Sequence, residues 1–118
     1  KGGIAHEMDP IPVTVWDQTC AWRKAGLEGL EAQGRRYRIA LESGHLSGQK
    51  AAVHADLAVA PIPRSALGGC IVEVSPEAGL PPLSSYELAL VVAEDLHEAG
   101  LAAADHLRAC FTEETMAA

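Results

Sequence analysis

Aromatic residues are scarce in this chain of 118 residues, which has two Trp, two Tyr and one Phe. The core must therefore be built from Val, Ile, Leu and Ala, a composition that suits a parallel sheet. Basic residues are also few, since nine Lys and Arg stand against sixteen Asp and Glu and the formal net charge is −7. A nucleic-acid surface needs a basic face that displaces counterions from phosphate, so this balance argues against direct DNA binding by these residues.

Long apolar runs are absent as well. No stretch reaches the roughly 20 apolar residues that span a bilayer, and no charged segment followed by an apolar one opens the chain. These absences predict a soluble protein of the cytoplasm that has no membrane partner. The chain starts at Lys1 without an initiator Met, which predicts that it is a fragment of a longer protein.

Cysteine is used sparingly. Cys20, Cys70 and Cys110 are far apart in the sequence, and no pair has the CxxC spacing. An odd number of widely spaced cysteines is unlike a disulfide framework. We therefore expect three reduced thiols that are partly buried.

Short apolar strands alternate with helical segments between Val13 and Pro63. This alternation is typical of a parallel sheet covered by crossover helices, so it predicts the α/β class with a mostly parallel sheet flanked by helices. The expected elements are strands over Val13–Trp16, Tyr37–Glu42 and Leu57–Ile62, a helix from near Thr19 to Gly34, and a short helix over Gly48–Ala55.

Side-chain periodicity adds expectations within these elements. Two glycines on the apolar face of the first helix, Gly26 and Gly29, predict that the helix backbone comes very close to the sheet. Alternation in the second strand places Tyr37, Ile39 and Leu41 on one side.

Turn-forming residues predict where the elements begin and end. Gly34 is a natural stop for the first helix, and Ser47 is placed to cap the second helix. Asp56 is expected to close the second helix in a left-handed conformation. Pro61 lacks a backbone N–H, so strand pairing is expected to stop there or to lie at a sheet edge.

The second half of the chain has a different character. Cys70–Val74 predicts a brief strand, Ser75–Ser85 a Pro-rich loop, and Tyr86–Val92 a strongly apolar strand. A final helix is expected over Ala99–Thr112. The tail over 113–118 has nothing to bury and should fray.

The carboxyl ends of the three expected strands mark the candidate site, in the segments Asp17–Cys20, Ser43–Ser47 and Pro61–Pro63. In open parallel sheets ligands lie there, because helix N-termini and free backbone N–H groups gather at that edge. Helix N-termini attract anions. The pattern therefore predicts a pocket for a small acid, made by Gln18, Thr19 and Cys20 together with Ser43, Gly44 and His45. The alternative is that these polar residues only cap the helices.

Two other kinds of chemistry would use some of the same residues. The thiol of Cys20 beside the imidazole of His45 would form the nucleophile of a small hydrolase, but no third residue has a clear orienting role. A metal site would draw on His6, His45, His54 and Cys20, and no pair among them has the spacing of helical or zinc-knuckle ligands. The sequence therefore predicts no catalytic residue, no metal and no cofactor.

The segments SGHLSGQKAAVHADLAVAPIPRS and GLPPLSSYELALVV, in this order of elements, resemble the effector-binding domain of LysR-type transcriptional regulators over about Pro10 to Phe111. The resemblance implies a fold like that of type 2 periplasmic binding proteins, in which two α/β subdomains enclose an effector. It implies a bacterial regulator that is not an enzyme and that binds DNA only through a winged helix-turn-helix missing from this chain. Asp56 stands where the family commonly has Gly.

The resemblance also implies how the chain is divided. Residues 1–12 would lead in from a missing first subdomain, 13–85 would form the second subdomain, 86–112 would return to the first as a C-terminal strand and helix, and 113–118 would be the tail. The effector, an organic acid or an amino acid, would face Ser43, Gly44, His45, Pro61 and Ile62, with Asp17–Cys20 as a secondary candidate.

Two further implications concern partners and relatives. Regulators of this family pair their effector domains side by side, so the protein is expected to be a homo-oligomer. The strand Tyr86–Val92 and the apolar stripe Leu101–Phe111 would be uncovered in this chain, so exchange of 86–112 between copies is one way in which it would associate. The alternative identity is a fragment of a solute-binding protein of transport, which has the same fold.

Overall fold

The computed structural model describes residues 2–87 and 89–116, with side chains through Phe111. The chain divides into two compact units, Lys1–Ser84 and Ser85–Ala118, and each is described by itself. Helices and a two-stranded parallel sheet are both present, so the predicted α/β class is confirmed at this coarse level. None of the described helices combines the length and the apolar composition needed to cross a membrane.

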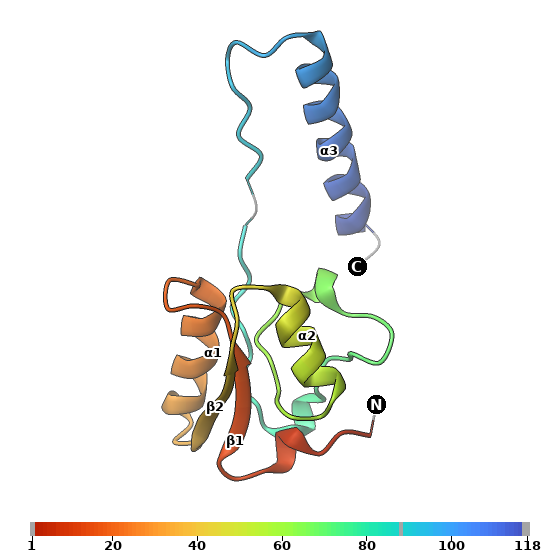
Figure 1. The fold of residues 1–118 in the computed structure, drawn as a ribbon. Helices are drawn as coiled ribbons and strands as arrows, with labels where there is room; N and C mark the ends of the chain where they lie inside the picture. The colour runs from red at the N-terminus through yellow and green to blue at the C-terminus, as the bar shows by residue number, and fades with distance from the viewer. Residues whose placement is uncertain (1, 88, 117–118) are drawn as a thin grey trace. The chain divides into compact units, whose positions relative to one another are not determined.

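The regular elements of the first unit begin close to their expected positions. β2 has the predicted bounds, while β1 begins at Ile11 rather than Val13 and α2 begins at Leu46 rather than Gly48. Ser47 therefore lies inside α2 and does not cap it. The elements are β1 (Ile11–Val15), α1 (Ala21–Ala32), β2 (Tyr37–Glu42) and α2 (Leu46–His54), with 3-10 turns at Ala5–Glu7, Arg64–Ala66 and Pro76–Ala78 (Figure 1).

β1 lies at the centre of the strand pairing. On one side it pairs in parallel with β2, and on the other it forms a single parallel bridge between Val13 and Val59. The Thr14 N–H donates to the carbonyl oxygen of Val59 at 2.8 Å, and the Val59 N–H donates to the carbonyl oxygen of Pro12 at 3.0 Å. The spatial order is thus β2, β1, Val59.

The third predicted strand, Leu57–Ile62, is reduced to this one bridge. Pro12 has no N–H to donate toward the segment that contains Val59, and Pro61 has none to donate beyond it. A longer ladder is therefore not formed, and the expectation that pairing stops near Pro61 is confirmed.

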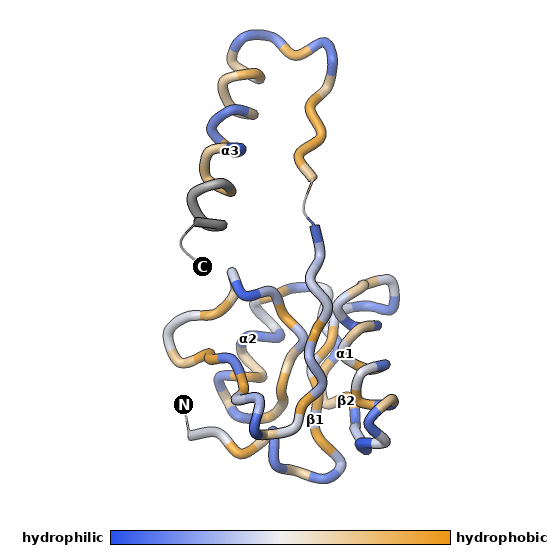
Figure 2. Tube along the Cα trace, turned by 180° about the vertical axis from the view of Figure 1, so that it is seen from behind, coloured by the Kyte–Doolittle hydropathy of each residue, from blue (hydrophilic) through white to orange (hydrophobic). Residues whose placement is uncertain are grey.

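α1 and α2 lie on opposite sides of the strands, as Figures 1 and 2 show from two directions. Alternate residues of β1 (Ile11, Val13 and Val15) pack with Leu30 of α1, and all four are at most 4% exposed. α2 packs on the other face. β1 is therefore covered on both faces, as expected for a strand of a parallel sheet.

The two glycines of α1 mark a close approach, but the prediction that the helix approaches the sheet there is wrong, because proline rings outside the paired strands lie against it. A Cβ on Gly26 would lie 2.9 Å from Cβ of Pro61, and one on Gly29 would lie 2.8 Å from Cβ of Pro81. Gly34 has φ +65°, which agrees with its predicted role at the helix end.

β2 contains a register shift that changes which side chains share a face. Val13 pairs with Ile39 but Thr14 pairs with Leu41, so one extra residue of β2 is accommodated there. Such a bulge reverses the alternation beyond it. Leu41 consequently faces α2, and the prediction that it shares a side with Tyr37 and Ile39 is wrong.

The strand predicted over Cys70–Val74 is also wrong. Gly68 and Ile71 form an isolated antiparallel bridge instead. Gly68 and Gly69 have φ of +133° and +62°, so the chain turns back on itself before a strand can extend.

In the second unit, the described residues of Tyr86–Val92 form no strand, and Leu88 lies outside the described residues. A strand requires a ladder, and neither the sheet nor an isolated bridge includes the described residues of this segment. α3 spans Glu98–Met116, so it continues past Thr112 into the tail that was expected to fray. The last two residues lie outside the described residues.

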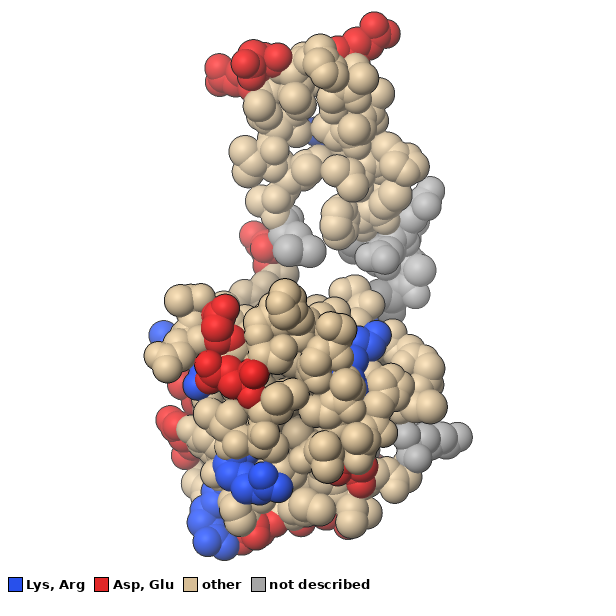
Figure 3. All heavy atoms as spheres, viewed as in Figure 1, with Lys and Arg blue, Asp and Glu red and all other residues tan. Residues whose placement is uncertain are grey.

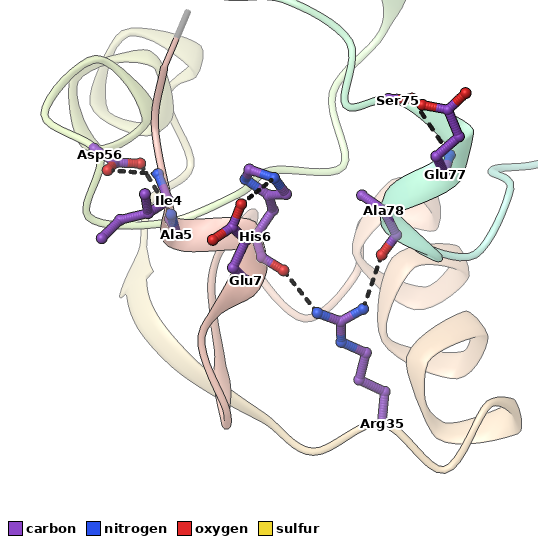
Figure 4. Close-up of polar contacts among 9 residues, drawn as sticks. All are labelled: Ile4, Ala5, His6, Glu7, Arg35, Asp56, Ser75, Glu77 and Ala78. Carbon is purple, nitrogen blue, oxygen red and sulfur yellow. Dashed lines mark hydrogen bonds and ion pairs between the residues drawn. The ribbon is translucent and has the colours of Figure 1, made fainter.

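The amino-terminal side of the first unit is held by the residue that ends α2. Asp56 has φ +54°, which confirms the predicted left-handed conformation. Its carboxylate accepts the N–H groups of Ile4 at 2.9 Å and Ala5 at 3.1 Å (Figure 4). Because these bonds favour the ionised form, they lower the pKa of Asp56 from its usual 3.8.

Replacing Asp56 by Asn should therefore make the free energy of unfolding depend less on pH in the acidic range. A carboxyl group whose pKa is lower in the folded than in the unfolded state stabilises the fold above its unfolded pKa, and that contribution is lost as the pH falls through the folded value. The wild-type advantage over Asp56→Asn in urea unfolding should be constant down to about pH 5 and shrink below it. An advantage that does not change down to about pH 3 would show that the carboxylate charge is not what matters.

Candidate functional site

Three chain segments leave the carboxyl ends of the paired strands at one edge of the first unit. Residues 16–20 connect β1 to α1, residues 43–45 connect β2 to α2, and Pro61 and Ile62 follow Val59. Since β2 and Val59 lie on opposite sides of β1, the connections diverge at β1. In open α/β sheets, ligands bind in the crevice at such a point.

The first two of these loops are joined to each other. The Ser43 N–H donates to the carbonyl oxygen of Val15 at 2.9 Å. A Cβ on Gly44 would lie 3.9 Å from Oδ2 of Asp17, an ordinary contact distance. The structure thus brings Asp17 close to Ser43 and Gly44, which are more than twenty residues away from it in sequence.

The polar side chains of these loops stabilise the loops rather than the helices. Oδ1 of Asp17 accepts the Thr19 N–H at 3.2 Å and the Thr19 hydroxyl at 2.8 Å. The Ser43 hydroxyl oxygen accepts the His45 N–H at 3.2 Å. Neither α1, whose N-cap is Cys20, nor α2, whose N-cap is His45, has a side-chain capping bond.

The alternative that the polar residues only cap helices is therefore wrong for Thr19, Cys20, Ser43 and His45. Two helix N-termini at one edge are left without side-chain caps. Each N-terminus carries roughly half a positive charge and backbone N–H donors. This arrangement can accept a carboxylate or another small anion.

The remaining predicted site residues are less closely associated. Pro61 is buried, and its ring lies against Gly26. Ile62 is half-buried and Gln18 is exposed. Among the residues that the structure describes, no hydrogen bond joins Pro61 or Ile62 to the other two loops.

The hydrolase and metal alternatives find no support in the geometry of this edge. Cys20 and His45 form no side-chain hydrogen bond with each other in the described part of the chain. Within residues 2–87 and 89–116, no group of three or more His, Cys, Asp or Glu side chains is placed to hold a metal ion.

Sequence reasoning missed a cluster beside these loops. Arg23, whose side chain is 14% exposed, donates from Nη1 to the carbonyl oxygen of Trp16 at 2.8 Å and to Oε2 of Glu42 at 2.5 Å. The rings of Trp16 and Trp22 meet edge to face, with centroids 5.8 Å apart. The sequence did contain a signal for this cluster: a Trp follows the first strand, and a Trp and an Arg stand in the first turn of the next helix.

The cluster also contains a buried hydrogen-bond donor, the indole nitrogen Nε1 of Trp16, for which the described residues provide no acceptor. An unpaired buried donor costs about 1–3 kcal/mol. Trp16 immediately precedes the loop that holds Asp17.

An apolar hollow of about 310 Å³ lies between β2 and α2. It is open to solvent, and no polar or titratable side chain lines it, so nothing in its wall would orient a ligand. Its lining residues are Ala40, Leu41, Gly48, Ala51, Ala52 and Leu57.

The charges of the first unit are mixed. On the face shown in Figure 3, its Lys and Arg side chains lie in separate places rather than in one patch. This pattern agrees with the excess of acidic over basic residues in the chain. Comparison of the chain with protein-family profiles, with curated proteins and with solved structures finds no match.

Proposed function

We propose that this chain is a ligand-sensing part of a bacterial LysR-type transcriptional regulator. The observation that carries the proposal is the meeting of the loops after β1 and β2, where two helix N-termini have no side-chain caps. The mixed α/β class and the order β2, β1, Val59 support a subdomain of the type 2 periplasmic-binding-protein kind. The protein would act in the cytoplasm, without catalysis, and would reach DNA only through a separate winged helix-turn-helix.

The effector in this proposal is a small organic acid or amino acid. Its carboxylate would accept N–H groups from the first turns of α1 and α2, where the helix dipoles favour negative charge. A second subdomain would form the opposite wall of the cleft. The effector would change the regulator only to the extent that it binds the closed arrangement better than the open one.

The proposed regulator is a homo-oligomer in which copies exchange residues 86–112. Apolar side chains in this part of the chain are about half exposed, with values of 50% for Leu101, 47% for Leu107 and 49% for Phe111. The described residues of 86–92 are mostly apolar and belong to no strand. A second copy would cover these apolar side chains of α3 and pair with residues 86–92 in a ladder.

The coding sequence around this segment would test the regulator identity directly. A helix-turn-helix encoded upstream of Lys1 in the same reading frame is the expected result. A secretory leader upstream would instead indicate a solute-binding protein of transport and would overturn the proposal.

Replacing Asp17 by Asn should separate the two effector classes. The Asp17 carboxylate is exposed beside the loop at Gly44, where it would repel an organic acid and attract the ammonium group of an amino acid. Loss of one exposed charge is worth about 1 kcal/mol, or roughly a fivefold change in Kd. Calorimetric titration with dicarboxylates and amino acids should show tighter binding of the former or weaker binding of the latter.

The control for this experiment is Glu28→Gln, which removes the same charge from the exposed side of α1 at a salt bridge with Lys24. It should leave both affinities unchanged. If Asp17→Asn behaves like Glu28→Gln with every ligand that binds, the ligand does not lie at this edge.

A further inference from the structure

α3 carries a pair of metal-ligating side chains that the sequence analysis did not consider. His106 and Cys110 are four residues apart, and Nε2 of the imidazole lies 3.8 Å from Sγ of the thiol. Both residues are exposed. Residues four apart share one face of a helix, so the two side chains extend over the same surface.

The separation of the two atoms fits one small cation. Zinc bonds to thiolate sulfur at about 2.3 Å and to imidazole nitrogen at about 2.0–2.1 Å, and a tetrahedral angle between these bonds puts sulfur and nitrogen about 3.6 Å apart. The observed 3.8 Å is close to this value without any change in the helix. Sulfur and imidazole together select soft or borderline cations rather than Mg²⁺ or Ca²⁺.

The described side chains around the pair, which extend through Phe111, do not oppose a cation. Arg108 is two residues from both His106 and Cys110, which places it on the opposite side of the helix. Its Nη1 is also paired with Oδ1 of Asp105 at 2.6 Å. Ala104, which is only 8% exposed, also lies away from the His106 and Cys110 face.

We propose that His106 and Cys110 form half of a binding site for a soft divalent cation such as Zn²⁺, and that a second copy of this chain supplies the other half. On binding, the Cys110 thiol releases its proton to solvent and the thiolate donates an electron pair to the cation. His106 donates the Nε2 lone pair and keeps its proton on Nδ1. This inference goes beyond the proposed sensing function and does not depend on it.

The second copy follows from the coordination number. Structural zinc sites have four protein ligands, whereas no third His, Cys, Asp or Glu joins the pair among the described residues. Two copies related by a two-fold axis through the metal would provide two thiolates and two imidazoles. The exposed position of the pair on α3 allows a second helix to approach it.

Titration of the reduced, metal-free 118-residue chain with Co²⁺ would test the proposal. Thiolate coordination to cobalt gives a charge-transfer absorption in the near ultraviolet, and Zn²⁺ should abolish it by displacement. We expect saturation at one metal per two chains, with a matching change from monomer to dimer in sedimentation velocity. Cys110→Ser and His106→Asn should each weaken binding by roughly tenfold or more.

Three variants make the result specific. Cys70→Ser and His54→Asn each remove an exposed residue of the same type and should bind Co²⁺ like the wild type. His106→Cys replaces one ligand by another and should retain tight binding, whereas His106→Asn should not. Circular dichroism should show unchanged helix content in all variants.

Other outcomes would overturn the inference. Absence of the charge-transfer absorption, or its persistence in both Cys110→Ser and His106→Asn, would exclude these ligands. Saturation at one metal per monomeric chain would exclude the second copy.

Discussion

Replacing Leu30 by Ala should lower the free energy of unfolding of the first unit by about 2–5 kcal/mol. Leu30 is 4% exposed and packs against Ile11, Val13 and Val15 of β1. The other buried residue of α1 is Gly26, which contributes no side chain. Leu30 is therefore the main apolar anchor of α1, and its truncation leaves a cavity beside the central strand.

Urea unfolding followed by tryptophan fluorescence would measure this change. Both tryptophans of the chain, Trp16 and Trp22, belong to the first unit, so the signal reports on that unit. Val72→Ala is the matched control, because Val72 is 56% exposed and its truncation should change stability by no more than about 0.5 kcal/mol. A loss at Leu30 as small as that at Val72 would contradict the described packing.

The second large effect on the free energy of unfolding is expected at Arg35. Just before β2, its side chain forms hydrogen bonds with two segments that are distant in sequence. Its Nη2 donates to the carbonyl oxygen of His6 at 2.6 Å and its Nη1 donates to that of Ala78 at 3.1 Å (Figure 4). Hydrogen bonds to charged groups contribute about 1.5–3 kcal/mol each. Because Arg35 is only half-buried, Arg35→Met should cost about 2–3 kcal/mol for the two bonds together.

The same urea experiment distinguishes this role from a general effect of charge. Arg38→Met removes the same charge from an exposed position of β2 and should have little effect. Arg35→Lys should recover only part of the loss, because an ammonium group lacks the planar fork that reaches both carbonyl oxygens. Equal stability of Arg35→Met and Arg38→Met would mean that the two carbonyl contacts contribute nothing.

The sequence predicted elements well where local pattern and turn residues agreed. Tyr37–Glu42 alternates and lies between Gly34 and the Ser43-Gly44 turn, and the strand has those bounds. β1 begins earlier than predicted because Pro12 was assigned to a loop. The missing N–H of Pro12 faces the side of Val59, where few ladder bonds form, so the proline is tolerated in a strand.

Pairing between segments could not be predicted from local pattern. Residues 86–92 have strong strand propensity, but propensity does not supply a ladder partner. The register shift opposite Val13 and Thr14 belongs to a pair of strands rather than to either one. For the same reason the position of Leu41 was predicted on the wrong face.

The sequence predicted where the loops of the candidate site meet, but it did not predict the side-chain contacts beside them. Topology alone places the ends of parallel strands at one edge, and the loops containing Asp17 and Gly44 do meet there. The role of Arg23 depends on its reach to Trp16 and Glu42. The distances from Arg23 to Trp16 and Glu42 depend on how α1 packs against the strands, and the sequence pattern does not predict this packing.

The bulge in β2 also makes the free edge of this strand a poor template for aggregation with other chains. The outer edge of β2 has no partner strand among the described residues, and an unpaired edge is a template for aggregation. A bulge interrupts the even spacing of backbone donors and acceptors that an incoming strand requires. It also sends Ile39 and Leu41, which are 43% and 38% exposed, to opposite faces. The edge therefore offers neither a regular ladder nor a single apolar row on which fibril-like stacking could start.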